Sequence, residues 1–317
     1  MIEVIVSKKC SVAEGICSFE LIGVEGPLPA FEPGAHIDVH VAPGVIRQYS
    51  LCNDPAESHR YVIGVLNEPA SRGGSRGLHE GIKVGDRLHI GEPRNLFALD
   101  PTATRHLLFA GGIGVTPILS MAWRLHAMGA EFEMHYCSRS KTHAAFVDAI
   151  EAAPFADRVQ FHFDNEPAQQ KLDAKAVLSE AAAGTHVYVC GPSGFMDHVL
   201  DTARQQGWAD GVLHREYFVA PTATDTGTDK PFELELKRSG LVVQVPAELT
   251  ALQVLEAAGV AVESSCEQGI CGACLTPVLE GEPEHRDQFL TDAERARNDQ
   301  FTPCCSRAQS ARLVLDL

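Results

Sequence analysis

The sequence has no long apolar run and no excess of basic residues. These two absences argue against a membrane segment and against a nucleic-acid partner. No stretch approaches the roughly 20 apolar residues of a membrane-spanning helix, so we expect no membrane segment. Lys and Arg number 26 against 42 Asp and Glu, which gives a formal net charge of −16. Nucleic-acid-binding surfaces are basic, so we expect no nucleic-acid partner.

The start of the sequence also lacks an export signal. Residues 1–7 show no basic region followed by an apolar core and a small-residue cleavage site. We therefore expect a cytoplasmic protein, in a compartment where disulfides are rare. The ten cysteines are then expected to be metal ligands and buried thiols. The length of 317 residues suits two or three domains.

Three of these cysteines stand in one short segment, S-C-E-Q-G-I-C-G-A-C-L. Cys266, Cys271 and Cys274 have the spacing C-x4-C-x2-C, and Cys304 follows farther along the chain. This is the plant-type ligand pattern of a [2Fe–2S] cluster, in which one loop supplies three thiolates and a distant segment supplies the fourth. The alternative is a structural zinc site, although such sites more often show a second C-x2-C pair or histidines.

The first hundred residues predict an all-β domain. Short apolar or alternating runs recur there, separated by turn residues such as Pro33-Gly34 and Pro43-Gly44. Strands are expected at 3–7, 18–22, 35–41, 46–51, 61–65 and 87–90. Several short strands with this punctuation favour a barrel or a sandwich.

Two stretches of this domain are suited to binding an anion. One is R-Q-Y-S-L (47–51), and the other is R-G-G-S-R-G (72–77), which leads into a short helical segment. A Gly-Gly-Ser turn exposes N–H groups and a hydroxyl group. Arg47 and Arg72 can add charge-assisted hydrogen bonds to a phosphate. Each stretch by itself is also compatible with an ordinary turn.

From residue 106 onward, apolar strands alternate with helical segments, which predicts βαβ units and a parallel sheet. Strands are expected at 106–110, 131–136, 159–163, 186–190 and 212–215, and helices at 116–128, 144–152, 174–183 and 193–207. The first strand ends in G-G-I-G-V-T-P (111–117) and the fourth in C-G-P-S-G (190–194). Both glycine-rich turns suit the close approach of a dinucleotide, although the first is not the usual G-x-G-x-x-G fingerprint.

The segment 220–230 consists mostly of small and polar residues and contains proline and glycine, so its composition predicts a linker. A third domain follows, with a hairpin of strands 232–236 and 241–245 and a helix at 250–258. The cysteine loop, a charged helical stretch at 292–296 and a closing strand at 313–317 come after it.

The order of the motifs resembles the phthalate dioxygenase reductase family over nearly the whole chain. These motifs are R-x-Y-S-L, G-G-S, G-G-I-G-V-T-P, C-G-P, E-Y-F (216–218) and the plant-type cysteine set. The resemblance implies a multidomain β + α/β + α+β chain. Its parts would be an antiparallel flavin-binding β-barrel at 1–100, a ferredoxin-reductase-like parallel α/β NAD domain at 101–222, a linker at 223–230, and a β-grasp [2Fe–2S] ferredoxin domain at 231–317.

The resemblance also implies which residues bind cofactors. FMN would be held by Arg47, Gln48, Tyr49, Ser50, Val65, Leu66, Asn67, Gly73, Gly74, Ser75, Thr116 and Phe218. The nicotinamide half of NADH, with NADPH as an alternative, would be bound by Gly112, Gly114, Cys190, Gly191 and Pro192. Ser138 and Arg139 would lie near the adenosine ribose. Thr116, Cys190 and Phe218 are expected beside the reacting rings. Phe218 as a core aromatic residue and Cys190 as a buried thiol are the alternatives.

The implied function is an NAD(P)H-dependent oxidoreductase, the reductase component of a Rieske-type aromatic-ring oxygenase or O-demethylase system. Electrons would pass from NADH through FMN to the cluster and on to a terminal oxygenase, and the reductase is expected to be monomeric. The sequence has no C-x-H pairs for a Rieske centre and no evident two-histidine, one-carboxylate set, so we do not expect an oxygenase. Two alternatives remain: an FMN/[2Fe–2S] electron carrier or redox sensor, and the reductase of a diiron hydroxylase.

Overall fold

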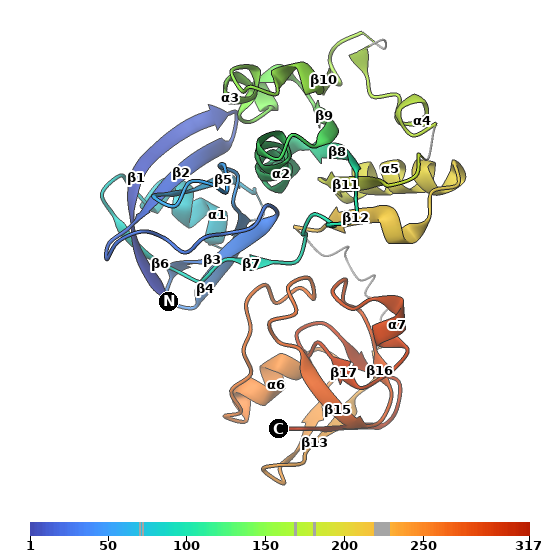
Figure 1. Ribbon diagram of the computed structural model, residues 1–317. Coiled ribbons are helices and arrows are strands. Elements are labelled where there is room, and N and C mark those ends of the chain that lie inside the picture. Colours follow the sequence, from blue (N-terminus) through green and yellow to red (C-terminus); the bar gives the residue numbers. More distant parts are fainter. Residues whose placement is uncertain (70, 72, 168–169, 180–181, 219–228) are drawn as a thin grey trace. The chain divides into compact units, whose positions relative to one another are not determined.

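The computed structural model describes residues 1–69, 71, 73–167, 170–179, 182–218 and 229–317. It divides into two compact units, Met1–Glu216 and Tyr217–Leu317. The first unit contains an antiparallel and a parallel sheet, and the second contains the cysteine loop (Figure 1). Among the described residues, no helix has the length and apolar character that crossing a membrane requires.

The antiparallel sheet of the first unit closes on itself. Its strands are β1 (Ile2–Ala13), β2 (Ile16–Gly23), β3 (Ala35–Ala42), β4 (Val45–Ser50), β5 (Tyr61–Leu66), β6 (Arg87–Ile90) and β7 (Arg94–Asn95). The order is β4-β3-β6-β1-β2-β5, with β7 paired to β3. An antiparallel bridge between Leu51 and Ile63 joins the two ends of this order, which makes the sheet a barrel.

Alternating apolar side chains explain why these segments form a barrel. Val4, Val6, Phe19 and Leu21 all point inward and are fully buried. Leu78 joins them from a helical connection that consists of α1 (Gly74–Arg76) and a π-helical turn, Gly77–Gly81.

Lys9 of β1 holds the end of this helical connection. Its Nζ donates to the carbonyl oxygens of Leu78, His79 and Ile82 at 3.0, 2.6 and 2.8 Å. A lysine on the last carbonyls of a helical turn satisfies acceptors that have no partner within the turn. The turn that was predicted to bind phosphate is therefore fixed to the barrel wall.

The second sheet is parallel throughout. Its strands are β8 (Arg105–Gly111), β9 (Glu131–Ser138), β10 (Val159–Phe163), β11 (Thr185–Cys190) and β12 (Leu213–Glu216). They lie in the order β10-β9-β8-β11-β12. Every residue of β11 is buried, as expected for a strand with both faces covered.

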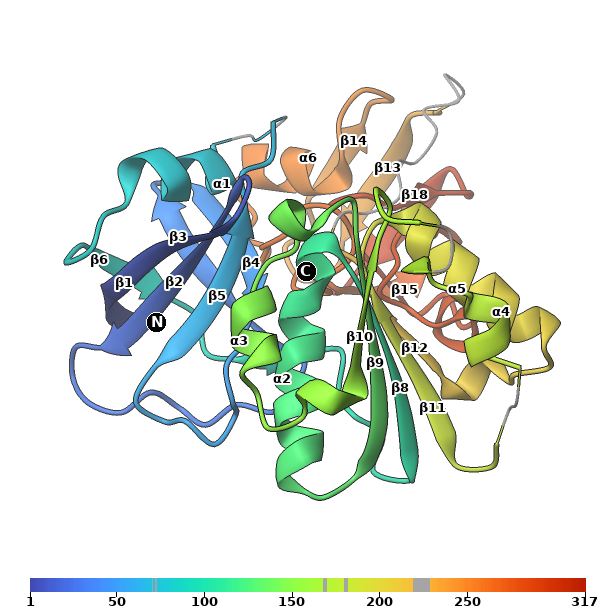
Figure 2. The same cartoon turned by 90° about the horizontal axis from the view of Figure 1, so that it is seen from above.

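Four helices cover the parallel sheet. They are α2 (Val115–Ala127), α3 (Val147–Glu151), α4 (Ala174–Val177) and α5 (Ser193–Gln205). Figure 2 shows α2 and α3 on one face and α4 and α5 on the other. Helix α3 is shorter than the predicted 144–152 because Phe146, at its start, has a left-handed backbone with φ 64°. Helix α4 ends before the predicted residue 183, and the Leu178 carbonyl just after it accepts a hydrogen bond from Trp208 Nε1 at 3.0 Å.

The second unit has a mixed sheet with one main helix. Its strands are β13 (Phe232–Leu236), β14 (Val242–Val245), β15 (Thr276–Glu280), β16 (Pro283–Glu284), β17 (Gln300–Phe301), β18 (Arg307–Ala308) and β19 (Arg312–Leu315), and its helices are α6 (Ala251–Ala257) and α7 (Asp292–Arg295). The main sheet has the order β14-β13-β19-β15-β17, in which β13 and β19 are parallel. A capping box of Thr250 and Gln253 starts α6, which buries Leu255 against the sheet.

Residues 219–228, which include most of the predicted linker, lie outside the described part of the chain. Asp229 and Lys230, its last two residues, contact the second unit. The Asp229 carboxylate forms ion pairs with Arg286 at 2.5 Å and Arg307 at 3.5 Å. Arg307 also donates to the carbonyl oxygen of Lys230 at 3.1 Å. The packed part of this unit therefore begins by Asp229.

Candidate cofactor sites

The structure brings the predicted phosphate-binding residues of the barrel together. Arg47 lies on β4, and its side chain packs against Gly74 at the start of α1. A Cβ atom at position 74 would be only 2.5 Å from Arg47 Cγ, so this approach requires glycine. A guanidinium group and a turn with free N–H groups form a suitable anion site. Arg72 lies outside the described residues.

The end of β5 is tied to the same turn. Ser75 Oγ accepts a hydrogen bond from the Glu68 N–H at 3.1 Å, and His79 Nε2 lies 2.8 Å from the Val65 carbonyl oxygen. Asn67 is held from the other side, because its N–H donates to Gly15 O at 2.8 Å. The end of β5, with Val65, Leu66 and Asn67, is therefore tied to the connection that begins with Gly73, Gly74 and Ser75.

The four predicted residues of β4 do not share one surface. Side chains alternate along a strand, which places Arg47 and Tyr49 on one face and Gln48 and Ser50 on the other. Gln48 Nε2 donates to Asp38 Oδ1 of β3 at 3.2 Å. Burial raises the pKa of Tyr49 to about 12, so its phenol group is protonated at neutral pH.

Thr116 lies where the barrel meets the parallel sheet. It is buried near the start of α2, and its Oγ1 donates to the Ile113 carbonyl oxygen at 3.1 Å. Its methyl group faces Gly64 of β5, where a Cβ atom would be 2.9 Å from Thr116 Cγ2. Thr116 is therefore beside Val65, another residue predicted to contact FMN.

The two glycine-rich turns of the parallel sheet pack against each other. They follow β8 and β11, which are neighbouring strands with Ala110 opposite Cys190. A Cβ atom on Gly114 would lie 2.3 Å from the Cys190 carbonyl oxygen, so only glycine fits there. The predicted nicotinamide residues Gly112, Gly114, Cys190, Gly191 and Pro192 thus converge at the carboxyl ends of the strands, where such sheets bind ligands.

The two residues predicted near the adenosine ribose follow β9 on the other side of β8. Ser138, the last residue of β9, is buried, whereas Arg139 is exposed. Only Arg139 is therefore free to meet a group that arrives from solvent.

A buried carboxyl group at this edge was missed by the sequence reasoning. Glu216 ends β12 directly opposite Cys190 of β11, and its Oε2 accepts a hydrogen bond from Ser50 Oγ at 3.1 Å. The residue as a whole is half-buried, and burial of the carboxyl group raises its pKa to about 8, against the opposing effect of the Ser50 hydrogen bond. Burial, with the nearby Glu216 carboxyl group, also raises the pKa of Cys190 well above its usual value.

At neutral pH this pair therefore carries two protons, one on a carboxylic acid and one on a thiol. Glu216 belongs to the E-Y-F motif, which follows the last predicted parallel strand. That position was the sequence signal that could have identified it as a residue near the cofactors. Phe218, from the same motif, is half-buried and belongs to the second unit, so its position over a flavin ring stays a prediction.

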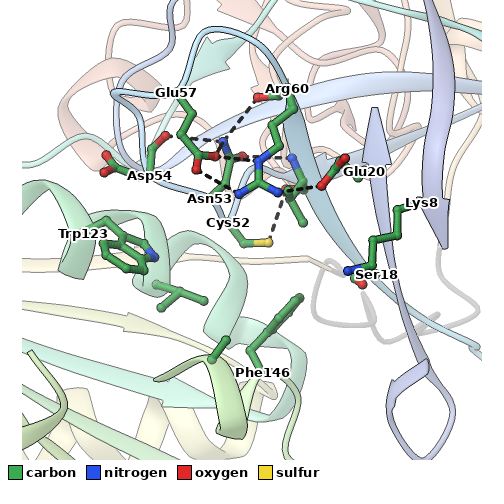
Figure 3. A pocket seen from close by; sticks show the side chains of 13 residues that line it. Lys8, Ser18, Glu20, Cys52, Asn53, Asp54, Glu57, Arg60, Trp123 and Phe146 are labelled. Carbon is green, nitrogen blue, oxygen red and sulfur yellow. Dashed lines mark hydrogen bonds and ion pairs between the residues drawn. The ribbon is translucent and has the colours of Figure 1, made fainter. Parts of the chain in front are cut away.

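A cavity of about 280 Å³ lies between the barrel and helices α2 and α3, and none of the predicted cofactor-binding residues line it (Figure 3). Trp123 and Phe146 line it from the parallel-sheet side. On the barrel side, Arg60 forms ion pairs with Glu20 at 2.6 Å and Glu57 at 2.8 Å. This cavity is separate from the predicted FMN and nicotinamide residues.

The cysteine loop in the second unit gathers its thiols around a small core. Cys274 and Cys304 are buried and pack together with Leu252 of α6. Backbone N–H groups point at two sulfurs: Gln268 N donates to Cys266 Sγ at 3.3 Å, and Ala273 N donates to Cys271 Sγ at 3.4 Å. Such N–H···S bonds stabilise thiolates and tune a bound cluster.

The thiols also perturb one another. A hydrogen bond from Cys271, supported by backbone N–H groups of the loop, lowers the pKa of Cys266 to about 6. A hydrogen bond from Cys304 likewise lowers the pKa of Cys274. The same two hydrogen bonds raise the pKa of the donor thiols, Cys271 and Cys304, so each pair holds one proton that a bound cluster would displace. Thiolates are the ligand form that an iron–sulfur cluster requires. The donor set therefore fits a [2Fe–2S] cluster held by Cys266, Cys271, Cys274 and Cys304.

Cys305 has different surroundings. Its Sγ lies 3.3 Å from Thr302 Oγ1 and 3.8 Å from Ser306 Oγ. It faces the backbone of Gly269, where a Cβ atom would be only 2.4 Å from the sulfur. Cys305 thus lies beneath the loop, among hydroxyl groups.

A buried aspartate supports the loop, and the sequence reasoning missed it as well. Asp287 Oδ2 accepts hydrogen bonds from the N–H groups of Leu290 at 2.7 Å and Phe289 at 3.1 Å. The neighbouring Gln288 N–H donates to Gly269 O at 2.8 Å. The segment 287–290 therefore fixes the middle of the cysteine loop.

Comparisons with known proteins agree with this arrangement. Residues 234–309 match the family model of the 2Fe-2S iron-sulfur cluster binding domain. Residues 92–212 match that of the N-terminal domain of dimethylamine monooxygenase subunit DmmA-like proteins. The vanillate O-demethylase oxidoreductase of a Pseudomonas species is 59% identical over 318 residues, which cover 100% of both chains.

Two further comparisons concern phthalate dioxygenase reductase. The Burkholderia cepacia protein is 42% identical over 314 residues, covering 98% of this chain and 96% of that one. A solved structure of phthalate dioxygenase reductase, described as a modular structure for electron transfer from pyridine nucleotides to [2Fe-2S], superposes with a TM-score of 0.76. It is 41% identical and covers 100% of this chain and 98% of that chain.

The barrel, the parallel sheet and the iron–sulfur domain together define an oxidoreductase of the modular electron-transfer class. Within that class, the chain belongs to the phthalate dioxygenase reductase family, which includes the vanillate O-demethylase oxidoreductases. The predicted family, fold class and oxidoreductase activity are confirmed. The roles of individual site residues and the domain boundaries stay predictions.

Proposed function

We propose that the chain is the reductase component of a Rieske-type aromatic-ring oxygenase or O-demethylase system, which takes electrons from NADH and delivers them to a terminal oxygenase. The observation that carries this proposal is full-length similarity to relatives named as such reductases, together with a 2Fe-2S domain in the same chain. When bound, FMN accepts two electrons together and releases them singly, and a [2Fe–2S] cluster carries one electron at a time.

The residues of the first unit would position these reactants. Arg47, with the Gly74–Ser75 turn, would hold the FMN phosphate, and Thr116 would contact the flavin from the second sheet. The turns 112–114 and 190–192 would receive the nicotinamide. Phe218, which belongs to the second unit, is also predicted to cover the flavin ring.

Cys190 and Glu216 would lie beside the nicotinamide without a negative charge. Since both are protonated at neutral pH, neither would repel the negative charge that the flavin gains on reduction. Ser50, which donates to Glu216, would orient that carboxyl group.

In the second unit, Cys266, Cys271, Cys274 and Cys304 would hold the cluster. We place the domains at 1–100, 101–222 and 231–317, with a linker at 223–230. This division is supported by the described strands: one sheet lies between residues 2 and 95, a second between 105 and 216, and the remaining two between 232 and 315. We also propose a monomer in the cytoplasm, where NADH is supplied and thiols stay reduced.

Reconstitution tests the function directly. The purified chain should reduce ferricyanide with NADH and support oxygen-dependent turnover of a Rieske-type oxygenase of aromatic substrates. A chain truncated after residue 222 should retain the ferricyanide reaction and lose oxygenase support, because the cluster is gone. Absence of NADH-dependent reduction of either acceptor would favour an electron carrier or a redox sensor.

Flavin identity addresses the other alternative. Flavin released from the protein should migrate as FMN in chromatography. Release of FAD, together with turnover of a diiron hydroxylase and none of a Rieske-type oxygenase, would favour the reductase of a diiron system.

A further inference from the structure

Three metal-ligating side chains from distant parts of the sequence meet at the amino-terminal edge of the parallel sheet. His186 lies near the start of β11, His214 lies on β12, and Asp100 lies in the segment 96–104 that leads into β8. The sequence shows no evident two-histidine, one-carboxylate set, and the described part of the structure contains one candidate group of this composition. Pattern reading missed the set because only the sheet brings these residues together.

The register of the sheet explains the arrangement. His214 is the neighbour of Tyr188, and side chains alternate along β11, so His186, Tyr188 and His214 emerge on the same face. Phe97 packs against Tyr188, with ring centres 6.0 Å apart. The connecting segment 96–104 therefore covers this face and brings Asp100 to the two histidines.

The three donor atoms are close enough to share one ion. His186 Nδ1 lies 2.9 Å from His214 Nε2 and 4.0 Å from Asp100 Oδ2. The ligand atoms of the three residues all lie within 4.8 Å of one another. Zinc–donor bonds of about 2.0–2.2 Å hold neighbouring donors roughly 3–4 Å apart, so only small side-chain movements are needed.

Neighbouring groups orient the donors. Asp100 Oδ1 accepts hydrogen bonds from the Thr102 N–H at 2.8 Å and the Thr102 hydroxyl at 2.5 Å, which leaves Oδ2 directed toward His186. The Asp100 N–H donates to Tyr188 Oη at 2.8 Å. The Tyr188 ring lies nearly parallel to His214, with ring centres 4.6 Å apart. Hydrogen bonds of this kind orient the ligands in known metal sites.

The chemistry of the donors indicates which ion they suit. Two imidazoles and one carboxylate prefer zinc and similar transition metals over magnesium or calcium. His186 is buried, whereas Asp100 and His214 are partly exposed, so an ion could enter from solvent.

We propose that Asp100, His186 and His214 form a binding site for one divalent transition-metal ion such as Zn²⁺, with water completing its coordination. With the ion bound, His186 carries its proton on Nε2 and His214 carries its proton on Nδ1, so that His186 Nδ1 and His214 Nε2 both offer a lone pair. Both rings turn slightly toward the ion. The site is structural. It lies at the opposite end of the strands from the predicted nicotinamide residues, and it ties the segment that joins the barrel and the parallel sheet to β11 and β12.

The test measures zinc bound to the holoenzyme. Wild-type protein with full FMN and cluster content is dialysed against micromolar Zn²⁺, and zinc and iron are quantified in the same sample by mass spectrometry. We expect about one more equivalent of zinc in the wild type than in Asp100→Asn or His214→Gln. Each variant should weaken zinc binding at least tenfold, with the iron content unchanged. Any zinc bound by thiols elsewhere in the protein should be equal in all samples, so it does not affect the difference between the wild type and the variants.

The chain offers a matched control. His135 and His162 form another imidazole pair, with Nδ1 and Nε2 3.1 Å apart, but Glu133 lies by Nε2 of His135, away from the shared edge. His162→Gln should therefore keep the zinc of the wild type. Equal zinc in the wild type, Asp100→Asn and His214→Gln would overturn the proposal, as would an equal loss in His162→Gln. Asp100 is partly exposed, so Asp100→Asn should fold, which circular dichroism checks.

Discussion

Ser50 on the barrel donates a hydrogen bond to Glu216 on the parallel sheet, and this bond joins residues 166 positions apart. The acceptor is a carboxyl group whose pKa is raised by burial to about 8. The contact therefore places a neutral carboxylic acid between the predicted flavin-binding and nicotinamide-binding residues.

The raised pKa of Glu216 predicts a specific dependence of stability on pH. In the unfolded chain this carboxyl group titrates near its usual value of about 4.3, so between about pH 5 and 8 the folded state holds one more proton. Folding is therefore favoured at low pH, and this contribution is lost as pH rises through 8. Relative to Glu216→Gln, the wild type should lose up to about 1.4 kcal/mol per pH unit in this window. Urea denaturation at several pH values measures the difference, and parallel pH profiles for the two proteins would contradict the buried carboxylic acid.

Arg47 is predicted to bind the FMN phosphate. Arg47→Ala removes a charge-assisted hydrogen bond worth about 1.5–3 kcal/mol, which corresponds to roughly tenfold or greater loss of FMN affinity. Ser75→Ala should also lower flavin occupancy, whereas both proteins keep the cluster absorbance. Arg87, on the same barrel, forms an exposed ion pair with Glu3, so Arg87→Ala is the control and should retain FMN. Full flavin occupancy in both Arg47→Ala and Ser75→Ala would refute the assignment of these residues to the FMN phosphate.

Arg139 is predicted to determine how well the chain accepts NADPH beside NADH. Its exposed position after β9 suits contact with a 2′-phosphate, while the chain has no acidic residue at 137–140 to select NADH. We expect NADH to be preferred and residual NADPH activity to depend on this side chain. Arg139→Ala should lower kcat/KM for NADPH several-fold and leave that for NADH nearly unchanged. Lys175→Ala, which removes another exposed cation of the same domain, should change neither. A wild-type preference for NADPH in steady-state kinetics would overturn the expected cofactor.

Cys304 and Cys305 are adjacent, but only one should bind iron. Cys304 is buried with Cys274, whereas Cys305 is half-buried: it packs against the edge of the same cluster, and its Sγ also lies beside the hydroxyl groups of Thr302 and Ser306. Cys304→Ala should abolish the electron paramagnetic resonance signal of the reduced cluster, while FMN reduction by NADH survives. Cys305→Ala should keep the signal and electron delivery to the oxygenase. The reverse result would shift the ligand by one residue, and no effect in either variant would refute the plant-type ligand set.

The sequence predicted the features that depend on local pattern. Strand alternation and glycine-rich turns located the sheets, and the cysteine spacing located the loop. The sequence pattern cannot show that the backbone of Gly114 contacts the Cys190 carbonyl group. The convergence of the turns after β8 and β11 was predictable, however, because both turns follow parallel strands.

Contacts between distant segments were the ones missed. Glu216 was visible only as part of a motif, because its raised pKa depends on burial of its carboxyl group. Asp287 reads as an ordinary charged residue until its hydrogen bonds to Phe289 and Leu290 are seen. His186 and His214 can be recognised as a pair of possible metal ligands only from the structure, in which β11 and β12 are neighbouring strands.

The ion pairs of Asp229 bear on how the iron–sulfur unit should be expressed alone. A fragment that begins at residue 231, where the predicted ferredoxin domain starts, would leave Arg286 and Arg307 without this carboxylate and Arg307 without the Lys230 carbonyl. Arg307 is buried and lies three residues from Cys304. Removing its partners would therefore destabilise the segment that carries a predicted cluster ligand. A fragment that begins at or before Asp229 keeps both partners and is the better starting point for spectroscopy of the isolated unit.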